Sequence, residues 1–115
     1  MNHVYVVQQP IAMRNGVAVP AFDFSAAEAF GRIEILAPNG KLILTPDVFR
    51  EMLRAKLDAF DPEQDYILPT GDYSVLFFVG MLLGARHDYI RILRWVADAK
   101  NYQPLLLDIG DDSTS

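Results

Sequence analysis

The chain has 115 residues, enough for one domain with its own hydrophobic core and too few for two domains of ordinary size. Its formal net charge of -5 argues against binding a phosphate backbone, and the absence of cysteine excludes disulfide frameworks, thiolate zinc sites and cysteine nucleophiles. Hydrophobic residues make up 51% of the chain, a high share for a small domain, and we expect part of this excess to lie in a self-association or partner interface.

Strand-forming sequence opens the chain and is followed by a long irregular stretch. Residues 3–7, HVYVV, are β-branched and aromatic, which predicts a strand covered on both faces. Residues 8–22 contain two prolines and an Asn15-Gly16 dipeptide, which predict a loop or a loose ribbon around that turn.

A short helix and a hairpin are expected next. Asp23 or Ser25 can cap a short helix over residues 26–30, because either side-chain oxygen can accept a free amide of the first turn. A strand over residues 32–37 follows, and residues 38–44 predict a tight turn and the short second arm of a hairpin.

Two helices are predicted around one short strand. Thr45 as N-cap and Pro46 at the first helical position predict an amphipathic helix that ends near Phe60. The strand covers residues 66–68 and is followed by a turn.

Asp72 is placed to cap the second helix, which is expected over about residues 73–87. This helix has no polar residue between Val75 and Ala85, so we expect it to be covered on more than one side, with neighbours that approach closely at Gly80 and Gly84. The apolar run is shorter than the about 20 residues that a membrane-spanning helix needs. Because residues 1–9 also lack the pattern of a secretory signal, we expect a cytoplasmic protein.

Two strands close the predicted fold. Residues 89–96, YIRILRWV, predict a strand parallel to residues 66–68. Residues 102–109 predict its antiparallel partner at a sheet edge or near a bulge, because Pro104 cannot donate to a ladder. The elements together predict an α/β sandwich, a single domain over residues 1–109 with a mixed sheet of about four to six strands, a C-terminal hairpin and two main helices on opposite faces, before a flexible polar tail.

One candidate ligand site is the edge of the sheet at the carboxyl ends of the parallel strands. The residues that follow the predicted strands there are Gln8, Gln9, Thr70, Gly71 and Asp72. The Thr70 hydroxyl and the amides of the turn could hold a phosphate at the helix N-terminus. Against this, the turn lacks a P-loop signature, and Asp72 puts a negative charge where the phosphate would bind. Asp72 as a structural N-cap is the favoured interpretation.

Catalytic and metal-binding signatures are not found. Five acidic residues between positions 58 and 72 are interpreted as a solvated turn before residue 66 plus a helix cap, rather than as a cation site: Asp58, Asp61, Glu63, Asp65 and Asp72. His3 and His87 lack the spacing of a zinc hydrolase, and Ser74 lacks a nucleophile elbow. We therefore expect no cofactor and no metal, and we do not favour an enzyme.

The predicted hairpin carries side chains of the kinds that dominate protein interfaces: Arg91, Arg94, Trp95 and Tyr102. Basic and aromatic residues also interleave in nucleic-acid stacking platforms, but the acidic residues nearby and the net charge argue against that interpretation. Trp95 could equally be a core residue.

Four segments carry a resemblance to known proteins: SAAEAFGRIEIL from Ser25, DYILPTGD from Asp65, IRILRW from Ile90 and YQPLLLDI from Tyr102. In their order the chain resembles small accessory proteins encoded by tailed bacteriophages, over most of its length from Ser25 onward. The resemblance supplies no activity, cofactor or catalytic residue. It implies a protein made in the cytoplasm of a bacterial host and acting through a host or phage protein.

We therefore predict a non-enzymatic protein-interaction module, a homodimer that uses an exposed sheet edge or the Trp95 hairpin as its contact surface and binds neither nucleic acid nor membranes. The alternative is a nucleotide or phosphate-metabolite binding protein, or a small enzyme, with its site at the Thr70-Gly71-Asp72 turn. An open pocket beside that turn would favour the alternative.

Overall fold

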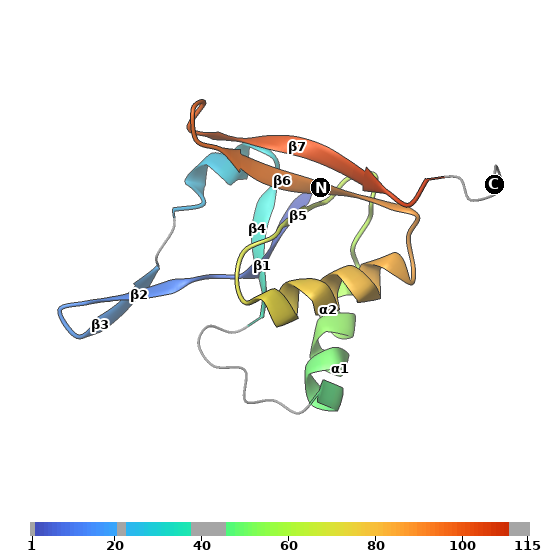
Figure 1. Ribbon diagram of the computed structural model, residues 1–115, viewed down its shortest axis with the longest axis horizontal. Helices are drawn as coiled ribbons and strands as arrows, with labels where there is room; N and C mark the ends of the chain where they lie inside the picture. Colours follow the sequence, from blue (N-terminus) through green and yellow to red (C-terminus); the bar gives the residue numbers. More distant parts are fainter. Residues whose placement is uncertain (1, 21–22, 38–45, 111–115) are drawn as a thin grey trace.

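The computed structural model describes residues 2–20, 23–37 and 46–110, which form a five-stranded mixed sheet, a separate two-stranded ribbon and three short helices (Figure 1). The sheet strands are β1 (His3–Gln8), β4 (Arg32–Ala37), β5 (Tyr66–Leu68), β6 (Tyr89–Val96) and β7 (Asn101–Asp108). Their order is β4-β1-β5-β6-β7, with β7 antiparallel to β6 and the other neighbours parallel. The predicted α/β fold with a mixed sheet, two main helices and a C-terminal hairpin is confirmed.

Strand β1 lies between β4 and β5 and is buried on both faces, as predicted. Val4 and Val6 belong to one buried cluster, and Tyr5 and Val7 belong to the other. This alternation follows from the two-residue repeat of a strand, which sends successive side chains to opposite faces. The sheet therefore has a core on each side.

The two main helices, α1 (Pro46–Leu57) and α2 (Tyr73–Gly84), share one face of the sheet. Leu53 of α1 and Val79 of α2 lie in the same buried cluster as Tyr5. The expectation of helices on opposite faces is wrong. The connections from β4 to β5 and from β5 to β6 cross the sheet in the same direction. Because parallel crossovers are right-handed, two crossovers in the same direction place their helices on the same face.

The opposite face is covered by η1 (Ser25–Ala29), a 3-10 helix in the connection that leads along the chain from β1 to β4. The chain crosses the sheet there in the reverse direction, which brings the segment to the other side. Phe24 packs with Leu93 in the second cluster. Neither predicted cap is formed: Phe24 is the N-cap residue, and the Asp23 carboxylate instead accepts the amide of Ser25 at 2.8 Å.

The ribbon consists of β2 (Ile11–Arg14) and β3 (Val17–Pro20), which pair antiparallel. Asn15 and Gly16 have positive φ values of 53° and 76°, as a tight two-residue hairpin turn requires. Of the two structures predicted for this stretch, the ribbon is therefore confirmed.

The ends of the main helices differ from the prediction in part. Asp72 caps α2 as predicted, since its carboxylate accepts the amide of Ser74 at 2.8 Å. Both helices end earlier than predicted, at Leu57 and Gly84. The predicted turn and hairpin arm over residues 38–44 and the Thr45 cap lie outside the described residues. No helix within the described ranges is long and apolar enough to cross a membrane.

Asp65 is buried at the start of β5, with an exposed fraction of 2%. One carboxylate oxygen accepts the amide of His3 at 2.9 Å, and the other accepts the amide of Asp61 at 2.8 Å. The interpretation of this acidic stretch as a solvated turn is therefore wrong for Asp65. A carboxylate is suited to this position because it accepts hydrogen bonds from two backbone amides that would otherwise lack an acceptor.

Candidate functional site

The Gln8 side chain lies at the turn after β5, where the sequence predicts a ligand site. The Gln8 side-chain oxygen accepts the amide of Asp72 at 3.0 Å, and the Thr70 hydroxyl donates to the Gln8 main-chain oxygen at 2.7 Å. Gly71 has a φ of 119°, and a Cβ there would lie 2.5 Å from the Gln8 Cβ, so both the backbone and the contact require glycine. The amides of Asp72 and Ser74 already donate within the chain. An anion at this turn would have to displace Gln8.

The structure thus brings together four of the five residues of the predicted ligand set: Gln8, Thr70, Gly71 and Asp72. The fifth, Gln9, directly follows β1 and is half-buried. Their arrangement joins the end of β1 to the turn between β5 and α2.

A cavity of about 760 Å³ opens on the η1 face, between η1, the end of β5 and the β6-β7 hairpin. Leu68 and Leu93 belong to the buried cluster of this face and line the cavity together with Phe24. Thr70, at the carboxyl end of β5, is the member of the predicted ligand set that lines it. The cavity therefore lies at the predicted edge of the sheet, but Gly71 and Asp72 are not among the residues that line it.

An aromatic pair forms the hairpin wall of the cavity. Trp95 and Tyr102 are register partners across β6 and β7, and their ring centroids lie 5.0 Å apart in an edge-on arrangement. Trp95 remains 50% exposed. Burial raises the pKa of Tyr102, and the nearby Asp23 carboxylate raises it further, so the phenol is neutral at physiological pH.

Charges of both signs accompany these apolar walls. Arg94 and Lys100, both exposed, line the cavity from the hairpin, and Asp23 lines it from the segment before η1. Hydrogen bonds from Ser25, the largest from its backbone amide, lower the pKa of Asp23, so this carboxyl group is ionised at neutral pH. An apolar lining with a few polar groups is the usual character of a binding site for a ligand or a partner side chain.

Three of the four hairpin residues predicted as an interaction surface line the cavity: Arg94, Trp95 and Tyr102. Arg91 does not. Its guanidinium lies 4.3 Å from the centroid of the Tyr66 ring and donates to the Tyr66 hydroxyl at 3.3 Å. Trp95 combines features of the two roles predicted for it, since its ring packs edge-on against Tyr102, yet the side chain is half-exposed and lines the cavity.

The η1 wall was missed by sequence reasoning. Residues 23–26 line the cavity, although they lie about 70 residues from the hairpin in the chain. Nothing in their spacing indicates a partner, because their position depends on which way the chain crosses the sheet. Across the described residues, no group of three or more His, Asp or Glu side chains is placed to hold a metal ion.

Comparison with known proteins gives one family. The family described as Phage Pam3 gp32-like protein matches residues 2–109, which includes the ribbon that the predicted resemblance left out. Comparisons with curated proteins and with solved structures find no significant match. The resemblance to phage proteins is confirmed, and since the match spans nearly the whole chain, the chain belongs to the Phage Pam3 gp32-like protein family.

Proposed function

We propose that the protein is a non-enzymatic interaction module that binds a segment of a host or phage protein in the cavity between η1 and the β6-β7 hairpin. The observation that carries this proposal is the Trp95-Tyr102 pair, which forms one wall of a cavity of about 760 Å³ and leaves Trp95 50% exposed. Trp, Tyr and Arg carry most of the binding free energy in protein interfaces. Membership in a phage family supports a bacterial cytoplasm as the setting.

The lining defines the chemistry of the bound segment. An apolar or aromatic side chain fits between Phe24, Leu93 and Trp95, where it would exclude water from the exposed part of the indole. Arg94 and Lys100 would meet acidic groups of the partner, and Asp23 would meet a basic one. These charges set orientation and association rate more than affinity, because they remain near water.

Capture from a bacterial lysate tests the proposal through a matched pair of variants. Trp95→Ala is expected to lower recovery of the partner at least tenfold, because truncating an interface tryptophan costs about 2 kcal/mol or more. Leu106→Ala is the control, since Leu106 is 55% exposed on the same hairpin and does not line the cavity. Equal recovery with the wild type and both variants would contradict a role for the cavity.

A second candidate function is binding of a nucleotide or sugar phosphate. It is favoured by the place of Thr70 in the lining and by the cavity volume, which lies in the range of about 300 to 1,000 Å³ of small-molecule sites. In a thermal-shift screen, a ligand at 100 times its dissociation constant would add about 2.7 kcal/mol of stability. We expect no such shift. A shift that Thr70→Val abolishes and Trp95→Ala preserves would favour the small molecule instead.

A further inference from the structure

Helix α2 presents an apolar face to solvent on the side of the sheet opposite the cavity. Tyr73, Phe77 and Met81 are 80%, 74% and 74% exposed and recur every fourth residue, so they form one stripe along the helix. The expectation that α2 is covered on more than one side is therefore wrong for the described structure. Three large apolar side chains exposed in one stripe indicate a contact surface.

Two glycines lie on the same outward face. At Gly80 and Gly84, no described atom other than the neighbouring backbone of the helix lies within 4 Å of the position that a Cβ would take. The face therefore has two aromatic side chains that project from the first half of the helix and two hollows in its second half, where Met81 also projects. The glycines are separated by four residues, as are Tyr73 and Phe77.

We propose that this face is the contact surface of a twofold homodimer in which α2 packs antiparallel against α2 of a second copy. Reversing the helix, which spans Tyr73–Gly84, exchanges Tyr73 with Gly84 and Phe77 with Gly80. Each ring then lies over a glycine of the other copy, and the twofold axis repeats both contacts. A parallel pair would instead set ring against ring and glycine against glycine. Because the face is complementary to itself when the helix direction is reversed, a second copy of the chain is the partner that fits it.

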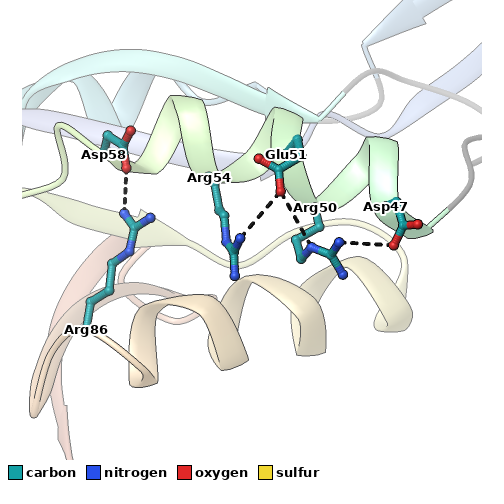
Figure 2. Close-up of polar contacts among 6 residues, drawn as sticks. All are labelled: Asp47, Arg50, Glu51, Arg54, Asp58 and Arg86. Atoms are coloured by element: carbon teal, nitrogen blue, oxygen red, sulfur yellow. Dashed lines mark hydrogen bonds and ion pairs between the residues drawn. The ribbon is translucent and has the colours of Figure 1, made fainter.

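Charged residues of α1 and of the segments that follow α1 and α2 border this face, and they are paired within the chain. Figure 2 shows them over the seam between the helices, where Arg50 contacts Asp47 at 3.0 Å and Arg86, just after α2, contacts Asp58 of the segment after α1 at 2.9 Å. Docking of a second copy on α2 leaves these pairs intact at the border. An apolar centre with a charged, hydrated border is the usual anatomy of a protein interface.

The size of the stripe is compatible with a dimer. If Tyr73 and Phe77 each bury about 150 Å², the two rings contribute roughly 300 Å² per copy, more than a third of the about 800 Å² that each partner buries in a standard interface, and Met81 adds to this area. The helix backbone at the two hollows and the charged border supply further contact.

The exposed edge of β7 is a weaker candidate for self-association. The Ile109 amide donates to the Asp88 oxygen at 3.1 Å, and hydrogen-bonded pairs alternate along an antiparallel ladder. In this register Pro104, opposite Leu93, has its nitrogen on the free side of β7. Because proline has no N–H to donate, the free edge is interrupted in its middle, which hinders pairing with another strand.

Light scattering on Gly80→Phe tests the dimer. The wild type is expected at twice the chain mass of 12.9 kDa, and Gly80→Phe at 12.9 kDa, because the new ring fills the hollow that receives Phe77 of the other copy. Unspecific hydrophobic association predicts the opposite, since the variant exposes more apolar surface. Far-UV circular dichroism verifies the fold, and replacing an exposed helical glycine leaves helix stability equal or higher.

An exchanged variant and two controls complete the test. F77G/G80F has the same composition as the wild type with ring and hollow interchanged, and it is expected to dimerise. Met13→Lys, at a 67% exposed position on the ribbon, is expected to stay dimeric. The proposal is overturned if the wild type is monomeric at every concentration, if Gly80→Phe remains dimeric, if the exchanged variant stays monomeric, or if Leu106→Lys on β7 dissociates the dimer.

Discussion

Replacing Asp65 by alanine is expected to lower the free energy of unfolding by about 3 kcal/mol, measured by urea denaturation. The buried carboxylate accepts the amides of His3 and Asp61, at 2.9 and 2.8 Å, and these contacts hold the start of β1 and the preceding turn to β5. Alanine leaves both amides, which are part-buried, without their acceptor, and each unmet buried donor costs about 1 to 3 kcal/mol.

Two further variants separate this role from charge alone. Asp65→Asn keeps one acceptor oxygen and is expected to lose roughly half as much stability. Asp58→Ala removes a carboxylate that is 68% exposed and paired with Arg86, and its effect is expected to stay below about 1 kcal/mol. A loss for Asp65→Ala no larger than that for Asp58→Ala would show that the buried carboxylate does not hold the two strands together.

Gly71→Ala is the second substitution with a large expected effect, a loss of about 3 kcal/mol of unfolding free energy. The φ of 119° at Gly71 disfavours any residue with a Cβ, and that Cβ would lie 2.5 Å from the Gln8 Cβ and 2.7 Å from its side-chain oxygen. The contact is with the β-carbon of a buried residue, so it cannot be relieved by a change of rotamer.

Gly16→Ala is the matched control for Gly71→Ala. Gly16 also has a positive φ, 76°, but no described atom beyond its two chain neighbours lies within 4 Å of the position that a Cβ would take. Gly16→Ala is expected to lower the free energy of unfolding by about 1 kcal/mol, because only the backbone conformation, and no steric contact, disfavours the Cβ. Chemical denaturation of the two variants side by side measures the difference. Equal losses would mean that Gln8 does not fill the turn as described.

The parts of the fold that local sequence could predict are those fixed by neighbouring residues. The Asn15-Gly16 turn, the Asp72 cap and strand β5 at residues 66–68 follow from backbone preference and hydrogen bonding within a few positions. The edge position of β7 could be predicted for a similar reason, because Pro104 lacks a donor.

The wrong predictions involve contacts between distant segments. The faces of the helices depend on strand order, which no local pattern encodes, and the burial of Asp65 depends on the amide of His3 at the start of β1. The exposed stripe of α2 could not be predicted, because composition does not distinguish an apolar helix that its own chain covers on several sides from one that it leaves exposed on one side.

Only part of the candidate site could be predicted from the sequence. Separate patterns, an aromatic hairpin and the carboxyl end of a strand, predict Trp95 and Tyr102 as interaction residues and Thr70 as a ligand residue, and the structure places all three on one cavity. The η1 wall could not be predicted, because Phe24 reaches the cavity only through the reversed crossover between β1 and β4.

Binding of a protein segment in the cavity is tested most directly by the emission of Trp95, the one tryptophan of the chain. Peptides selected from a random library on the wild-type protein are expected to change this emission saturably, and to bind Trp95→Ala at least about tenfold more weakly by calorimetry. If no peptide is enriched, or if the selected peptides leave Trp95 emission unchanged and bind Trp95→Ala as tightly as the wild type, the cavity is not the binding site.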